Sequence, residues 1–147
     1  HEFSAAHAES AYGVDRMAEH YVHTGMIALD GAKMSKSLGN LVFVHKLTEE
    51  GHDPSAIRLA VFAGHYRQDR DFSSSLLTAA GQRLDRWRER LAQDADESRV
   101  HESVAKLKEA LALDLDTPSA LEVIDQAPGD HDGVLTAAID SLLGVQL

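Results

Sequence analysis

A short stretch rich in lysine and serine decides how the whole chain is interpreted. It consists of Lys33-Met34-Ser35-Lys36-Ser37 and continues as Leu38-Gly39-Asn40. Lysine side chains are mobile point charges, serine hydroxyls and backbone N–H groups donate hydrogen bonds, and glycine lets the backbone bend tightly. A loop of this composition can wrap a polyphosphate. The stretch therefore predicts a phosphate-binding loop, and the alternative is a polar surface loop that binds no ligand.

The residues before this loop predict one strand and one or two helices. Residues 21–29 are rich in Val, Thr, Met, Ile and Leu, which is typical of a buried strand. Asp30-Gly31 is a pair typical of a tight turn. Further upstream, the alanine-rich residues 2–12 predict a helix that ends at Gly13, and residues 14–20 predict a further short helical piece.

Downstream of the loop the pattern is helical almost throughout. A short helix is expected at 46–50, and Asp53-Pro54 gives an N-cap and a first-turn proline for a helix over 56–65. After a polar connector at 66–72, apolar residues recur at steps of three and four, which predicts an all-α bundle. The stripes are Leu76, Leu77, Ala80, Leu84, Trp87 and Leu91, then Val100, Val104, Leu107 and Leu111; further helices are expected at Thr117–Gln126 and Val134–Leu143.

Composition bounds the class of protein. The chain has 147 residues, of which 44% are hydrophobic and 26% charged, so it can bury a core. It has no cysteine, which excludes disulfides and thiolate metal sites within it. No apolar run approaches the roughly 20 residues that span a bilayer, and no signal-peptide pattern opens the chain. We therefore expect a soluble, cytoplasmic protein with no membrane partner.

The net charge of −10 is distributed unevenly. Residues 1–47 carry a net charge of −1, and the remaining residues carry −9. An acidic surface repels a polyphosphate backbone, so a nucleic-acid partner is not expected.

The stretch at 33–37 resembles the KMSKS signature of class I aminoacyl-tRNA synthetases. Other segments in order along the chain are similar to cysteinyl-tRNA synthetases and, more closely, to a shortened relative, the cysteine ligases of mycothiol biosynthesis. The resemblance covers essentially the whole chain and corresponds to the C-terminal part of such an enzyme. The segments are His1 to Glu9, His23-Thr24-Gly25-Met26-Ile27, Asp53 to Leu59, Gly64-His65-Tyr66-Arg67 and Asp114 to Leu121.

The resemblance implies a fold that is mostly α. Residues 1–66 would be the C-terminal end of a Rossmann-like catalytic domain, with a short strand and the KMSKS loop, and residues 67–147 would be a helical bundle domain. The Gly64–Arg67 segment and the Asp114/Asp116 pair are then expected to form structural hydrogen bonds rather than to contact substrate. Trp87 is expected in the core, and the arginines of the first bundle helix are expected on a solvated face: Arg83, Arg86, Arg88 and Arg90.

The resemblance also implies a reaction. The carboxylate of L-cysteine attacks ATP to give cysteinyl-adenylate and pyrophosphate, and the amine of glucosaminyl-inositol then attacks the activated carbonyl. Lys33 and Lys36, with Lys36 ranked first, would be the catalytic residues that neutralise the leaving pyrophosphate. The implied ATP-binding residues are Met26, Ile27, Lys33, Met34, Ser35, Lys36 and Ser37. Ile27 fits a core position of the strand equally well.

The same resemblance places a zinc ion in the full-length enzyme but not in this chain. Aligned on Glu2, the zinc-binding histidine of the synthetases would lie just before His1, and the cysteine ligands would lie further upstream. Ser4 stands where the synthetases have a ligating glutamate, a departure that favours the ligase. Because the chain begins without Met and inside a helical pattern, we expect a fragment. The resemblance places the nucleotide-binding half and the zinc upstream, so the fragment is expected to be inactive alone.

Two alternatives remain open at this point. One is a fragment of cysteinyl-tRNA synthetase, but that enzyme continues into an anticodon-binding region and must hold tRNA, whereas this chain ends in an apolar helix and is acidic. The other is a non-catalytic helical interaction module that retains a relic of the loop. A monomer is expected in each case.

Overall fold

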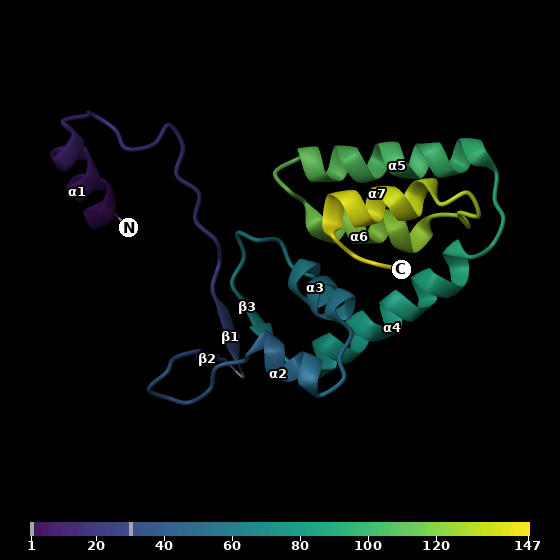
Figure 1. Cartoon of the computed structure of the whole chain (residues 1–147), viewed down its shortest axis with the longest axis horizontal. Helices are drawn as coiled ribbons and strands as arrows, with labels where there is room; N and C mark the ends of the chain where they lie inside the picture. Colours follow the sequence, from purple (N-terminus) through teal and green to yellow (C-terminus); the bar gives the residue numbers. More distant parts are fainter. Residues whose placement is uncertain (1, 30) are drawn as a thin grey trace.

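The computed structural model describes residues 2–29 and 31–147 (Figure 1). Seven helices and three short strands are found in these residues, so the expectation of a mostly α fold is confirmed. In chain order they are α1 Glu2–Tyr12, β1 Ile27–Leu29, β2 Ala32–Lys33, α2 Val44–Glu49, α3 Pro54–Phe62, β3 Arg70–Phe72, α4 Ser74–Leu91, α5 Glu97–Ala112, α6 Thr117–Gln126 and α7 Val134–Leu143.

The three strands form one small sheet in the order β2-β1-β3. β1 pairs antiparallel with β2, with Ala28 opposite Lys33, and parallel with β3, with Ala28 opposite Asp71. The expected strand at 21–29 is therefore real only in its last three residues, which are exposed or partly exposed rather than buried. The connector expected at 66–72 is wrong in its second half, where β3 forms. The turn between β1 and β2 contains Gly31 at φ +73°, and the Asp30 half of the predicted pair lies outside the described residues.

The hydrophobic core lies in the helical part of the molecule and is shared by α3 to α7. Trp87 of α4 is completely buried, as expected, together with Leu59 of α3, Leu107 of α5 and Leu121 of α6. Figure 1 shows α5 running along α6 and α7, both of which it contacts, with α4 running obliquely below them. α3 contributes to this core although it precedes residue 67. The expected division between residues 1–66 and 67–147 stays a prediction.

Side-chain caps begin most of these helices. The Asp53 carboxylate accepts a hydrogen bond from Ser55 N at 2.8 Å, as the sequence predicts, and Ser73 Oγ accepts one from Leu76 N at 3.1 Å at the start of α4. The cap of α6 is Asp116, which directly precedes Thr117. No helix forms at 14–20, all of which the structure describes.

The arginines of α4 correct another expectation. Arg83 donates to the Asp125 carboxylate of α6 at 2.9 Å, and Arg90 donates to the Asp125 carbonyl at 2.7 Å. Arg88 donates to Asp53 Oδ2 at 2.9 Å. Arg86 and Arg88 are exposed as expected, whereas Arg83 and Arg90 are partly buried, and Arg83, Arg88 and Arg90 join α4 to its neighbours.

α1 lies apart from the helical core. In Figure 1 a long extended segment joins it to β1, and none of its described side chains is buried. No helix in the described residues has the length and apolar character needed to cross a membrane.

Candidate functional site

The sheet carries an open cleft of about 330 Å³ beside the start of the lysine loop. Among the predicted site residues, Met26, Ile27 and Lys33 line it together. The rest of its lining is Ala28, Gly31, Asp69, Arg70 and Asp71. The other predicted residues, Met34 to Ser37, follow β2 and lead into a turn at 36–39, and they are not among the residues that line the cleft. Whether either set binds ATP stays a prediction.

The lysine loop is closed by hydrogen bonds of its own. Asn40 Oδ1 accepts from Ser35 N at 2.8 Å, and Asn40 Nδ2 donates to the Lys33 carbonyl at 3.3 Å. The Ser35 and Ser37 hydroxyls lie 3.2 Å apart, and Gly39 N donates to the Lys36 carbonyl at 3.2 Å with Gly39 at φ +65°. These bonds hold the loop in a tight turn.

Lys33 and Lys36 are both exposed, so their ammonium groups are open to an incoming anion. The sequence places Asn40 only at the end of the loop, and its two hydrogen bonds across the loop are found in the structure. An asparagine next to a glycine is the signal that could have suggested it, since asparagine often bonds nearby backbone in turns.

Two aspartates of the β3 segment fix the rim of the cleft. Asp69 Oδ1 accepts from Met26 N at 2.7 Å, and Asp71 Oδ1 accepts from Gly31 N at 3.1 Å. Arg70 N donates to the Met26 carbonyl at 2.9 Å, while burial lowers the pKa of the Arg70 guanidinium, which donates to the Gly64 carbonyl. The sequence reading missed these residues because they lay in the expected connector.

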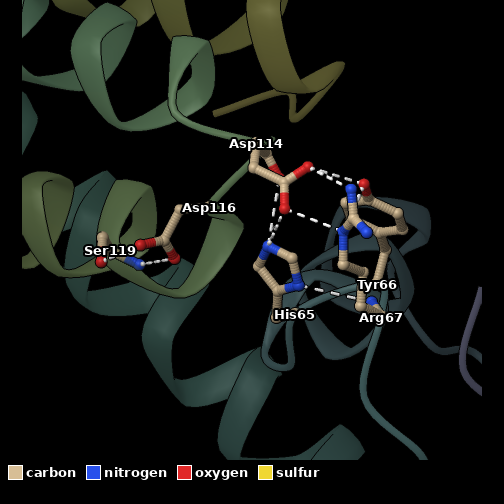
Figure 2. Close-up of polar contacts among 6 residues, drawn as sticks. All are labelled: His65, Tyr66, Arg67, Asp114, Asp116 and Ser119. Carbon is tan, nitrogen blue, oxygen red and sulfur yellow. Dashed lines mark hydrogen bonds and ion pairs between the residues drawn. The ribbon is translucent and has the colours of Figure 1, made fainter.

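Three consecutive residues, His65, Tyr66 and Arg67, lie around Asp114 from a distant part of the chain, as Figure 2 shows. Asp114, in the turn between α5 and α6, accepts from Tyr66 Oη at 2.7 Å and lies 2.8 Å from Arg67 Nε. Its carbonyl oxygen lies 3.0 Å from His65 Nε2. The Gly64–Arg67 segment makes the expected hydrogen bonds, and its lack of contact with substrate stays a prediction. We call His65, Tyr66, Arg67 and Asp114 the Asp114 cluster.

Hydrogen bonding sets the protonation of this cluster. The hydrogen bonds from Arg67 and then Tyr66 lower the pKa of the Asp114 carboxyl, whereas the bond to Asp114 raises the pKa of the Tyr66 phenol. His65 Nδ1 accepts from Arg67 N at 3.3 Å, so its Nε2 must carry the proton that is donated to the Asp114 carbonyl.

Asp116 lies two residues further on and has a separate, structural role. Its carboxylate accepts from Ser119 N at 3.1 Å and from Ser119 Oγ at 2.6 Å, which caps α6 (Figure 2). These bonds, first the one from the Ser119 hydroxyl, lower the pKa of Asp116. Asp114 and Asp116 are therefore held by separate sets of partners.

The described residues do not fit a zinc centre. The chain has no cysteine, and no three His, Asp or Glu side chains converge among residues 2–29 and 31–147.

Comparison with known proteins places this geometry in a family. The family model described as tRNA synthetases class I (C) catalytic domain matches residues 1–82. Curated relatives that match the whole chain are named L-cysteine:1D-myo-inositol 2-amino-2-deoxy-alpha-D-glucopyranoside ligase. They include proteins of Corynebacterium aurimucosum, 56% identical over 157 residues, Corynebacterium striatum, 65% over 147, and Corynebacterium diphtheriae, 51% over 157.

The chain spans 38%, 36% and 38% of the length of these three relatives. They confirm the resemblance to the mycothiol cysteine ligases that the sequence segments indicated. The family match extends across the lysine loop, the small sheet and the first turns of α4. The chain therefore belongs to the class I tRNA synthetase (C) catalytic-domain family.

Proposed function

We propose that this chain is part of an ATP-dependent ligase that activates L-cysteine as cysteinyl-adenylate and joins it to the amine of glucosaminyl-inositol. The observation that carries the proposal is the closed loop at 33–40, which leaves Lys33 and Lys36 exposed, with Lys33 at the edge of an open cleft. The names of the relatives support the same reaction class.

The described residues suit the adenylation step. Attack of the cysteine carboxylate on the α-phosphate forms a P–O bond and breaks the bond to pyrophosphate, which leaves with its charge. Such a step gains most from in-line positioning and from charges placed where the leaving group develops. Lys36 and Lys33 supply those charges, the Ser35 and Ser37 hydroxyls donate to phosphate oxygens, and the backbone at Met26 and Ile27 borders the adenine.

The test uses the intact enzyme and ATP–pyrophosphate exchange in the presence of cysteine. Lys36→Ala should lower the exchange rate about a hundredfold, the usual loss when one transition-state donor is removed. Lys46→Ala is the matched control, since Lys46 is an exposed lysine on α2 outside the loop and should leave exchange unchanged. Exchange unaffected by Lys36→Ala would instead favour the non-catalytic helical module.

A cysteinyl-tRNA synthetase remains the rival, because the family model takes its description from tRNA synthetases. The acidic charge of the residues after 47 favours the amino sugar over tRNA as the acceptor. Single-turnover transfer from preformed cysteinyl-adenylate should give product with glucosaminyl-inositol and none with tRNA. Charging of tRNA alone would reverse this assignment.

We further propose that residues 1–147 by themselves catalyse no exchange. The chain spans under two fifths of the relatives, and adenylation needs a binding site for the reacting cysteine carboxylate as well as for the leaving pyrophosphate. The same exchange assay on the isolated chain should give the background rate, and exchange above background would contradict this.

A further inference from the structure

The Asp114 cluster joins the helical bundle to the segment that holds the candidate ATP cleft. Three side-chain donors, from Tyr66 and Arg67, converge on one carboxylate from the opposite part of the chain. These residues are partly exposed, with 47% of the Asp114 side chain and 59% of Arg67 accessible. A single exposed ion pair contributes little, but several donors on one acceptor restrict its position much more.

The turn that carries Asp114 has an unusual backbone. Asp114 and Leu115 both have φ +54°, in the left-handed region that leucine rarely adopts. Hydrogen bonds from Leu115 N to Leu111 O and from Asp116 N to Ala110 O hold the turn on the end of α5. This conformation presents both the carboxylate and the carbonyl of Asp114 to residues 65–67 (Figure 2). Strain of this kind persists only where surrounding contacts hold it, and it is concentrated at functional sites.

A continuous set of contacts leads from this cluster to the cleft. The carbonyl of Tyr66, whose hydroxyl bonds Asp114, accepts from Gly25 N at 2.7 Å. Gly25 precedes Met26, and Met26 N donates to Asp69 in the same 65–72 segment. A Cβ on Gly25 would overlap the Gln68 carbonyl, so the two backbones are in direct contact. The position of residues 65–69 therefore sets the position of the residues that begin β1.

We infer that Asp114 is a positioning residue for ATP: from the bundle it fixes residues 65–69, and through them the Met26–Ile27 edge of the nucleotide cleft. Asp114 itself touches no substrate. The inference rests on the proposed function, because it assigns ATP to this cleft. It predicts that the cluster affects ATP binding and leaves cysteine binding unchanged.

The experiment measures KM for ATP and for cysteine, with kcat, in ATP–pyrophosphate exchange by the intact enzyme. Asp114→Ala and Tyr66→Phe should each raise KM for ATP, Asp114→Ala by about fivefold, as expected for losing charge-assisted hydrogen bonds in a partly exposed site. KM for cysteine should stay at the wild-type value. The double variant should have no larger effect than Asp114→Ala, because Tyr66 acts through the same carboxylate.

Asp96→Ala is the matched control. Like Asp114, Asp96 is an exposed aspartate at an end of α5 whose carboxylate accepts hydrogen bonds. Its partner is the neighbouring Ser98, and it caps the start of the helix. It should leave both KM values unchanged even where it lowers the melting temperature. If Asp114→Ala does not fold, Tyr66→Phe still tests the inference, because it removes only one hydroxyl.

Two outcomes overturn the inference. One is a wild-type KM for ATP in folded Tyr66→Phe and Asp114→Ala variants, and the other is an equal rise in Asp96→Ala. Lys36→Ala, assayed in parallel, separates this failure from failure of the proposed function. If Lys36→Ala loses exchange while the cluster variants keep wild-type KM values, only the positioning role is contradicted. If Lys36→Ala keeps normal exchange, the assignment of ATP to the loop is contradicted.

Discussion

The side chain of Asn40 holds the backbone of Ser35 at 2.8 Å, so the residue that closes the lysine loop lies outside the signature itself. The same amide donates to the Lys33 carbonyl and thus bonds both ends of the stretch 33–35. Because a loop that is already folded loses less conformational entropy when phosphate binds, this bridge should contribute to nucleotide affinity.

Asn40→Ala should loosen the loop without unfolding the protein. Ser35 N and the Lys33 carbonyl then lose their partner, and the two exposed lysines become better sites for trypsin. We expect faster cleavage after Lys33 and Lys36 in limited proteolysis followed by mass spectrometry. Asn40→Asp keeps an acceptor for Ser35 N but cannot donate to Lys33, so its cleavage rate should be intermediate. Equal cleavage in all three proteins would show that the bridge does not order the loop.

Gly25→Ala should separate β1 from the segment that precedes β3. The added methyl group would overlap the Gln68 carbonyl, and backbone cannot move aside as cheaply as a flexible side chain. We expect lower protection of residues 25–29 in hydrogen exchange and weaker ATP binding by calorimetry on the intact enzyme.

Gly81→Ala is the control for that substitution. Gly81 lies inside α4 and has open space around the position of a Cβ. The change should stabilise the bundle by about 0.5–1 kcal/mol through helix propensity, with ATP binding unchanged. If Gly25→Ala behaves like Gly81→Ala, the close approach at Gln68 has no structural consequence.

The helices were predictable because local signals agree with one another. The stripe from Leu77 to Leu91 has the helical period, and Ser73 provides a cap at its start. α7 ends as expected because Gly144 adopts φ +62° after its last apolar residue. In these elements the sequence determines both the limits of the helix and the face that is buried.

The sheet and its cleft could not be predicted in the same way. β3 consists of Arg70, Asp71 and Phe72, which is too short and too polar to show a period, and its pairing with β1 joins residues about forty positions apart. The roles of Asp69 and Asp71 as acceptors for backbone N–H groups depend on that pairing. The contacts of Arg83 with Asp125 were missed for the same reason, because the partner lies on another helix.

The folded state should become less stable in acid as the Asp53 carboxylate takes up a proton. Burial acts to raise the pKa of this carboxyl, but hydrogen bonds from Ser55 and the charge of Arg88 outweigh it, so the pKa is lowered below the ordinary 3.8. The unfolded chain therefore binds the proton more readily, and the contribution of Asp53 is present above pH 3.8 and lost as pH falls through the lower folded pKa.

Asp53→Asn isolates this contribution, because asparagine can still cap α3 but carries no charge. The melting temperature of the wild type should exceed that of Asp53→Asn at pH 7, and the difference should shrink as pH falls below 3.8 and vanish below the lower folded pKa. High salt should shrink the difference at pH 7, since the partner Arg88 is partly exposed. A difference that is constant across this pH range would contradict the assignment.

Among the charged residues of the bundle, Asp125 should cause the largest loss of folding stability when it is replaced. It accepts from the buried Trp87 indole N–H at 2.7 Å and from Arg83 at 2.9 Å, while its carbonyl accepts from Arg90. Asp125→Ala leaves the Trp87 donor buried without a partner, which costs about 1–3 kcal/mol. Native-state hydrogen exchange in peptides of α4 and α6 of the intact protein should report the loss.

Glu122→Ala provides the comparison for Asp125, since Glu122 is an exposed acid on the same helix and should change stability by less than about 0.5 kcal/mol. Trp87→Phe removes the donor and keeps an aromatic ring in the core. Combined with Asp125→Ala, it should cost less than the sum of the two single changes, because no unpaired N–H remains. Strictly additive losses would mean that Asp125 stabilises the bundle through its arginines rather than through Trp87.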